Sequence, residues 1–172
     1  IFYIDSKFSP VGIGLVVSGL VKGKSINVGS ELLIGPYNNE FKRVKAWSMH
    51  NNTKNVVQTL HDRQRGCLAI KPLDGKEDVT KLSIRKGMII ISKESENNIC
   101  YEFMAKINIL NHSTVISKKY TPVIHCGTVR QSARIVITEN QELKAGDEAE
   151  VRFRFVQTPE YIEKDSIFFF RE

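Results

Sequence analysis

The sequence is poor in the residues that build disulfide frameworks, metal sites and membrane spans. Its three cysteines, Cys67, Cys100 and Cys126, are odd in number and widely spaced, which predicts reduced thiols and a cytoplasmic protein. No Cys-x-x-Cys or His-x-x-x-His pair occurs, and the adjacent His125 and Cys126 would point to opposite faces of a strand. No apolar run approaches the ~20 residues that a transmembrane helix needs. We therefore expect no metal site, no disulfide and no membrane partner.

A complete nucleotide-binding loop is also missing. The stretch SGLVKGKS, residues 18–25, ends in Gly-Lys-Ser, but Ser18 stands where the first glycine of the phosphate loop would be. Residues 26–36 then alternate as strand, turn and strand, which leaves no helix to face a phosphate. We interpret the stretch as a hairpin of a barrel. No Asn-Lys-x-Asp motif and no ordered Ser/His/Asp or Cys/His set is present, so we expect no catalytic residues and no cofactor in this chain.

Period-two alternation of apolar and polar residues dominates the chain. Residues 101–109, 133–138 and 151–155 place apolar side chains on one face and polar ones on the other, and shorter apolar runs at 11–17 and 88–91 read as further strands. No convincing helical stripe is present. Many short, evenly spaced strands predict an all-β fold of two consecutive small antiparallel β-barrels.

A polar stretch, KESENN at 93–98, is the expected linker between the two barrels. We predict a first domain at residues 1–93 and a second at residues 99–172, with the last strand of the second truncated. The formal net charge of +6 favours an anionic partner such as nucleic acid.

Several motifs then occur in a characteristic order. The stretch VGIGLVVSGLVKGKSINVGSELLIGP, with VKAWSMH and RKGMIIIS after it, resembles the second domain of translational GTPases, the family of elongation factor Tu and elongation factor one-alpha. Leu15 replaces the family's usual Thr. The Tyr120–Val123 segment, GDEAEVRFRF and PEYIEKDSIFFFRE resemble the third domain, and VIHCGTVRQSARI with TPEY is similar to the GTP-binding-protein-one subfamily.

The resemblance implies a translation-protein barrel followed by an elongation-factor C-terminal-type barrel. It implies a parent GTPase whose N-terminal G domain binds GTP and magnesium, and a non-catalytic two-barrel arm that binds aminoacyl-tRNA or related RNA, docks that G domain and meets the ribosome. The alternative is a protein-interaction scaffold that transmits the nucleotide state with little RNA affinity.

The family motifs also imply RNA contacts at particular positions, because barrel rims can stack bases and basic residues can bind phosphates. The candidates are Ser48, Met49, His50, Arg63, Gln64 and Arg65 in the first barrel, and Lys118, Lys119, Arg130, Gln131 and Arg134 in the second. The simpler interpretations are a surface role for His50 and a solubilising role for Lys118 and Lys119. We expect Trp47 in the core, His125 and Cys126 in core packing or a specificity role, and Arg152 and Arg154 on a wet face or paired with Glu150 and Glu160.

Overall fold

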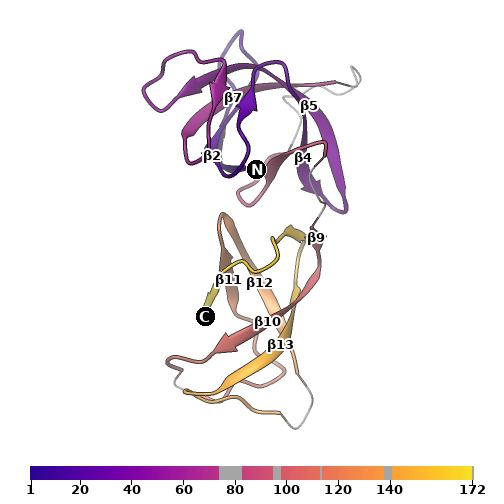
Figure 1. Ribbon diagram of the computed structural model, residues 1–172. Coiled ribbons are helices and arrows are strands. Elements are labelled where there is room, and N and C mark those ends of the chain that lie inside the picture. Colours follow the sequence, from indigo (N-terminus) through magenta and orange to yellow (C-terminus); the bar gives the residue numbers. More distant parts are fainter. Residues whose placement is uncertain (74–82, 95–97, 113, 138–140, 172) are drawn as a thin grey trace. The chain divides into compact units, whose positions relative to one another are not determined.

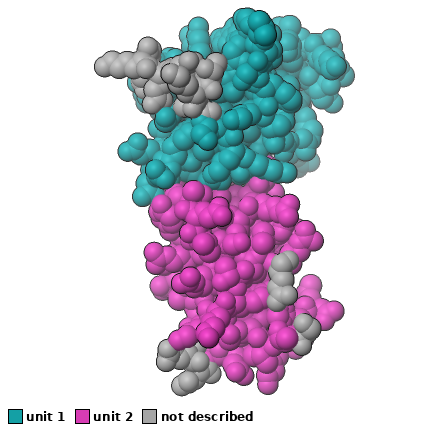
Figure 2. Space-filling view, turned by 180° about the vertical axis from the view of Figure 1, so that it is seen from behind, with its two compact units in different colours: residues 1–97 teal, residues 98–172 magenta. Residues whose placement is uncertain are grey.

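The chain divides into two compact units, residues 1–97 (unit 1) and residues 98–172 (unit 2), which Figure 2 shows in different colours. The computed structural model describes residues 1–73, 83–94, 98–112, 114–137 and 141–171. Half of the predicted linker, residues 95–97, lies outside these ranges. No helix occurs among the described residues, and within them no segment has the length and apolar character that a membrane-crossing helix requires.

Unit 1 is a closed antiparallel β-barrel with the strand order β1–β2–β7–β5–β4–β8 (Figure 1). Its strands are β1 (Phe2–Phe8), β2 (Leu15–Val21), β4 (Glu31–Tyr37), β5 (Glu40–Asn51), β7 (Arg65–Pro72) and β8 (Ile89–Ser92). Two short strands, β3 (Ile26–Asn27) and β6 (Thr59–Leu60), pair with each other.

Alternation along β2 explains how the barrel of unit 1 is filled. Leu15, Val17 and Val21 point inward and are at most 2% exposed. The inward position between them is Gly19, where a Cβ atom would lie 1.9 Å from the backbone oxygen of Tyr3. Glycine is therefore required at this position for β1 and β2 to approach each other.

Unit 2 contains a five-stranded antiparallel sheet with the order β10–β13–β12–β11–β15 and a separate strand pair, β14 with β9 (Figure 1). Its strands are β9 (Ile99–Cys100), β10 (Glu102–Asn108), β11 (Val123–Cys126), β12 (Val129–Val136), β13 (Glu148–Phe155), β14 (Glu160–Tyr161) and β15 (Phe169–Arg171). The predicted alternation is confirmed in β12 and β13, where Ala133, Ile135, Val151, Phe153 and Phe155 are at most 3% exposed. The rings of Phe103 and Phe168 pack on Phe153 in the core.

The prediction of an all-β fold with barrels is confirmed. In unit 2, however, the described strands form an open sheet with β10 and β15 at its edges, where the sequence predicted a second closed barrel. Alternation shows which face of a strand is buried but not which strands pair, so it does not reveal whether a sheet closes.

The first half of SGLVKGKS is the end of β2, and its second half, residues 22–25, connects β2 with β3 and does not lead into a helix. The prediction that it forms a hairpin is wrong, because β2 pairs with β1 and β7 while β3 pairs with β6. The amide of Gly23 donates a hydrogen bond to the Asp62 carboxylate at 2.7 Å, and the Ser25 hydroxyl bonds His61 Nδ1 at 3.1 Å. The Gly23 amide that would face a phosphate is therefore already hydrogen-bonded to the Asp62 carboxylate, so these residues do not fit GTP.

Candidate nucleic-acid interface

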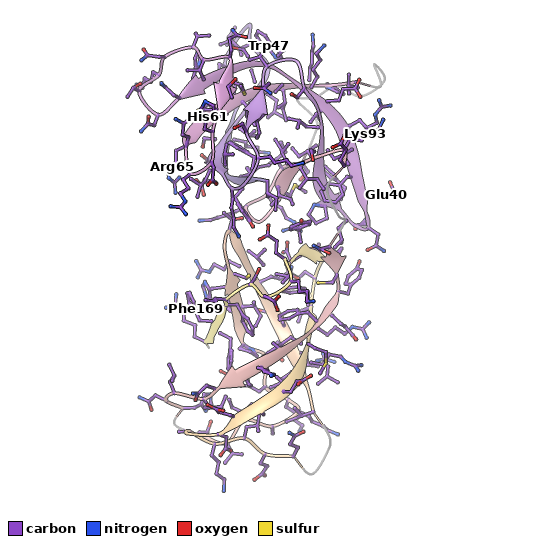
Figure 3. All side chains as sticks on the ribbon, viewed as in Figure 1. Glu40, Trp47, His61, Arg65, Lys93 and Phe169 are labelled. Atoms are coloured by element: carbon purple, nitrogen blue, oxygen red, sulfur yellow. The ribbon has the colours of Figure 1, made fainter. Side chains whose placement is uncertain are left out.

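The structure reverses the predicted positions of Trp47 and Met49. Trp47, expected in the core, is 40% exposed, whereas Met49, expected to contact RNA, is 1% exposed. The cause is a β-bulge, because β5 pairs with β7 through Ala46 and then through Ser48, which leaves Trp47 as an extra residue. The bulge shifts the alternation by one residue, so Met49 turns inward. Figure 3 shows Trp47 at the outer edge of unit 1, and the assignment of Met49 to an RNA surface is wrong.

Four neighbouring strands carry a mostly apolar row of side chains across the outside of unit 1. We call this row the apolar strip; in spatial order it consists of Phe8, Val16, Ala69 and the adjacent Ser48 and Trp47. Phe8 is 51% exposed, while Ala69, between the two aromatic residues, is only 6% exposed. The strip therefore has a shallow floor with an exposed aromatic ring toward each end.

Polar and basic residues border the apolar strip. On one side His50 lies directly opposite Cys67, and on the other Lys45 lies directly opposite Lys71. Their chain neighbours Val44, Ala46 and Ile70 are at most 1% exposed and point inward, so both lysines point outward. Exposed aromatic rings beside cations form a surface that can stack a base and hold its phosphate.

Arg65 begins β7 on the same outer face as Ala69, about 13 Å further along the strand at ~3.3 Å per residue. Its guanidinium forms an ion pair with Asp5 at 2.5 Å. The Arg65 side chain is 63% exposed, and exposed ion pairs are weak, so a phosphate can compete for this guanidinium. Figure 3 shows Arg65 near His61, on a different part of unit 1 from Trp47.

The preceding turn contains the other two predicted residues of this loop. Gln64 accepts a hydrogen bond from the amide of His61 at 2.9 Å, so its side chain shapes the turn. Arg63 has a positive φ of 64° and lies 3.7 Å from the Asp62 carboxylate. The structure thus gives Gln64 a structural contact and leaves Arg63 and Arg65 at the surface.

In unit 2, three predicted residues line one hollow of about 570 Å³. We call it the basic groove; its lining side chains include Lys118, Lys119, Arg134, Arg154, Thr121 and Glu102. The lysines come from the turn before β11, Arg134 from β12 and Arg154 from β13. Among the described residues that line it, four are cationic and one is a carboxylate, so the hollow has an excess of positive charge there and suits a phosphate backbone.

Glu102 is the partner of both arginines of β13. Its carboxylate lies 3.3 Å from Arg154 and 3.7 Å from Arg152. The expected pairing of these arginines with Glu160 is therefore wrong. Glu160 is 1% exposed and is hydrogen-bonded to Gln131 in a buried polar cluster. Register explains the difference, because Glu102 lies directly opposite Arg154.

Gln131 belongs to that buried cluster and does not form part of an RNA surface. It is 7% exposed, and its amide nitrogen donates to Glu160 at 2.6 Å. Its carbonyl oxygen accepts from the amides of Gln157 and Thr158 at 2.8 and 2.9 Å. The prediction for Gln131 is wrong because alternation on β12 turns it inward, while its neighbour Arg130 points outward.

The same cluster affects a neighbouring thiol. Burial, followed by the charge of Glu160 and by Cys126, raises the pKa of Cys100 to about 11. Cys100 therefore stays protonated near neutral pH, and all three cysteines are free thiols.

Sequence reasoning missed five residues that lie in or beside the apolar strip with Ser48: Phe8, Val16, Ala69, Lys45 and Lys71. Alternation with the buried Phe2 and Ile4 would place Phe8 inside, and a β-bulge between Ile4 and Ser6 turns it outward. The alternation gave no signal for Trp47, because the bulge that turns it outward appears only in the pairing of β5 with β7.

Comparison with known proteins gives similarity over nearly the whole chain. GTP-binding protein 1 of Xenopus laevis is 36% identical over 99% of the chain, and human GTP-binding protein 2 is 31% identical over 99%. The resemblance predicted from the motifs is confirmed. The chain is related to GTP-binding proteins 1 and 2. Elongation factor 1-alpha of Hyperthermus butylicus is 31% identical over 96% of the chain. No protein-family model matches.

The similarity covers only part of these relatives. The chain spans 25% of the length of GTP-binding protein 1, 28% of GTP-binding protein 2 and 38% of the elongation factor. The GTP-binding that the relatives' names describe therefore concerns proteins much longer than the matched segment.

Proposed function

We propose that the chain is a non-catalytic RNA-binding arm of a GTP-binding, elongation-factor-like protein, and that it binds aminoacyl-tRNA or a related RNA. The apolar strip carries this proposal, because the exposed rings of Phe8 and Trp47 flank a shallow floor with Lys45 and Lys71 alongside. An unpaired terminal base would lie on the strip, with its phosphate toward the lysines.

The basic groove of unit 2 supplies the second contact in this proposal. Lys118, Lys119, Arg134 and Arg154 would hold the phosphates of a paired region without reading its sequence. Neither surface requires a reacting group, so the chain would bind and not catalyse.

The remaining partners follow from the relatives. The proposal assigns GTP and magnesium to a G domain outside this chain, which the two units would dock, and includes the ribosome as a further partner. It places protein biosynthesis in the cytoplasm, which the free thiols favour.

Removal of the Trp47 ring tests the role of the apolar strip. The probes are a labelled RNA stem with an unpaired 3′ tail and the same stem without the tail, followed by fluorescence anisotropy. We expect the full chain to prefer the tailed stem, and Trp47→Ala to weaken that complex about tenfold, since one stacked base contributes ~1–3 kcal/mol.

Trp47→Phe should retain part of the affinity, and Leu110→Ala, which removes an exposed apolar side chain of unit 2 outside the strip, should change neither complex. Equal affinity of Trp47→Ala and the unaltered chain for the tailed stem would contradict the role of the strip.

The alternative function is a docking scaffold that transmits the nucleotide state. The exposed Val11 and Ile13, in the loop that joins β1 to β2, favour a protein contact near the strip. This alternative predicts little RNA affinity at low salt and measurable binding to a separately expressed G domain.

A further inference from the structure

The outer face of β11, β12 and β15 carries a row of side chains that the proposed function does not use. Arg130 on β12, His125 on β11 and Phe169 on β15 lie directly opposite one another in register. Their chain neighbours Ile124, Val129 and Gln131 are buried, so the row itself points away from the core. Figure 3 shows Phe169 at the side of unit 2.

Phe169 and His125 form a flat stack. Their ring centroids are 4.7 Å apart, and the ring planes differ by 6°. Phe169 is nevertheless 61% exposed, so the ring face turned away from His125 is accessible to solvent. The imidazole fixes the orientation of the phenyl ring, which lowers the entropy lost when a planar ligand stacks on it.

Two guanidiniums lie beside the stack. Arg171 follows Phe169 by two residues on the same face of β15, and Arg130 lies opposite His125. Burial and then the charges of Arg171 and Arg130 lower the pKa of His125, which indicates that both cations are close to its ring. Within the part of the chain that the structure describes, neither guanidinium has a carboxylate within 4.0 Å. The next row of the same face adds only Val123 and Ser132.

We propose that this face, the stacking platform, binds one unpaired nucleotide of an RNA. The base would stack on the free face of Phe169, and its phosphate would lie toward Arg171 on the same strand, with Arg130 adding positive charge from the other side of His125. The proposal rests on RNA binding by the chain and adds a second nucleotide site, in unit 2, to the strip of unit 1.

Charge composition favours RNA over a protein as the occupant. Arg171 lies on the same strand as the exposed Phe169 ring, Arg130 lies on the other side of His125, and neither guanidinium is paired with a carboxylate among the described residues, so the face suits a planar anion. A planar ring flanked by cations matches the alternating bases and phosphates of a single strand, and stacking tolerates any base because each has a π-face.

The test uses the full chain and two RNA probes: a single-stranded oligonucleotide carrying 2-aminopurine and a fully paired RNA duplex. Variants are Phe169→Ala, Phe169→Tyr, and Ile167→Ala as a matched control, because Ile167 is an apolar residue of the same segment and is 95% exposed. Each variant is also measured with Trp47→Ala, so that stacking on unit 1 is separated from stacking on unit 2.

We expect Phe169→Ala to weaken single-strand binding about tenfold and to reduce 2-aminopurine quenching, with duplex affinity unchanged. Phe169→Tyr should retain the quenching, and Ile167→Ala should match the unaltered chain. Unchanged affinity and quenching in Phe169→Ala, with RNA still bound, would overturn the platform and leave the proposed function standing. No binding of either RNA by the unaltered chain would overturn both.

Discussion

Gln131 is a polar side chain on which the interior of unit 2 depends. Its side-chain amide donates to Glu160 and to the carbonyl oxygen and hydroxyl of Thr158, and it accepts from the backbone amides of Gln157 and Thr158. Glu160 is 1% exposed, so its carboxylate relies on donors inside the protein. The loop before β14 is thereby tied to β12, and the loss of this one side chain would leave several buried polar groups without partners.

Gln131→Leu should lower the free energy of unfolding by about 3 kcal/mol, because buried polar groups that lose their partners cost ~1–3 kcal/mol and charged groups more. Urea denaturation followed by tyrosine and tryptophan fluorescence measures the change. Arg130→Ala, an exposed neighbour on the same strand, is the control and should shift the value by less than about 0.5 kcal/mol. A Gln131→Leu chain as stable as the control would show that the network contributes nothing.

Individual positions were the least predictable from the sequence. Ser48 and His50 lie on the outer face and Lys118, Lys119 and Arg134 share a groove, and these residues could be chosen from motifs and charge. Met49 and Gln131 could not be excluded as RNA contacts from the sequence. The burial of Met49 depends on the β-bulge at Trp47, and the burial of Gln131 depends on which face of β12 is turned inward, which the motif does not give.

Among the strands, β2 shows how one residue sets the distance between neighbours. At Gly19 the strand lies so close to β1 that a methyl group would collide with the backbone oxygen of Tyr3 and with the ring of Phe2. Backbone atoms cannot move aside as the end of a flexible side chain can. The closed order of the barrel therefore depends on this glycine, and Val16, three residues earlier on β2, depends on it for its place in the apolar strip.

Gly19→Ala should destabilise the chain by about 3 kcal/mol, the upper part of the usual range for overpacking. Circular dichroism during thermal unfolding measures the effect. Ser18→Ala is the matched control, since it alters the adjacent residue and removes one exposed hydrogen bond to Ser6. A Gly19→Ala chain that melts with the control would contradict the close approach of β1 and β2.

Strands were far easier to predict than their connections. Alternation correctly marked β10, β12 and β13, because each has one buried and one wet face. It could not show that β2 pairs with β7 across more than forty residues of chain, nor that the sheet of unit 2 is open, since pairing depends on contacts between distant segments.

For the chain as a whole, the distribution of charge matters more than the net value of +6. Cations gather in the basic groove, beside the apolar strip and around the stacking platform, and each group lies next to apolar or aromatic surface. Surfaces of this composition hold RNA through phosphates and through stacking, so affinity should fall with salt in proportion to the number of phosphates bound.

The salt dependence of RNA binding tests this account most directly. The dissociation constant of the full chain for a tailed RNA stem is measured from 50 to 300 mM salt, together with a Lys118→Gln, Lys119→Gln, Arg134→Gln variant and a Lys144→Gln, Lys164→Gln control. We predict tight binding at low salt and a steep loss with rising salt. The groove variant should have a logarithmic slope shallower by roughly 0.7–0.9 per phosphate contact removed, with the control unchanged. Weak binding at every salt concentration, or equal slopes for the groove variant and the unaltered chain, would contradict it.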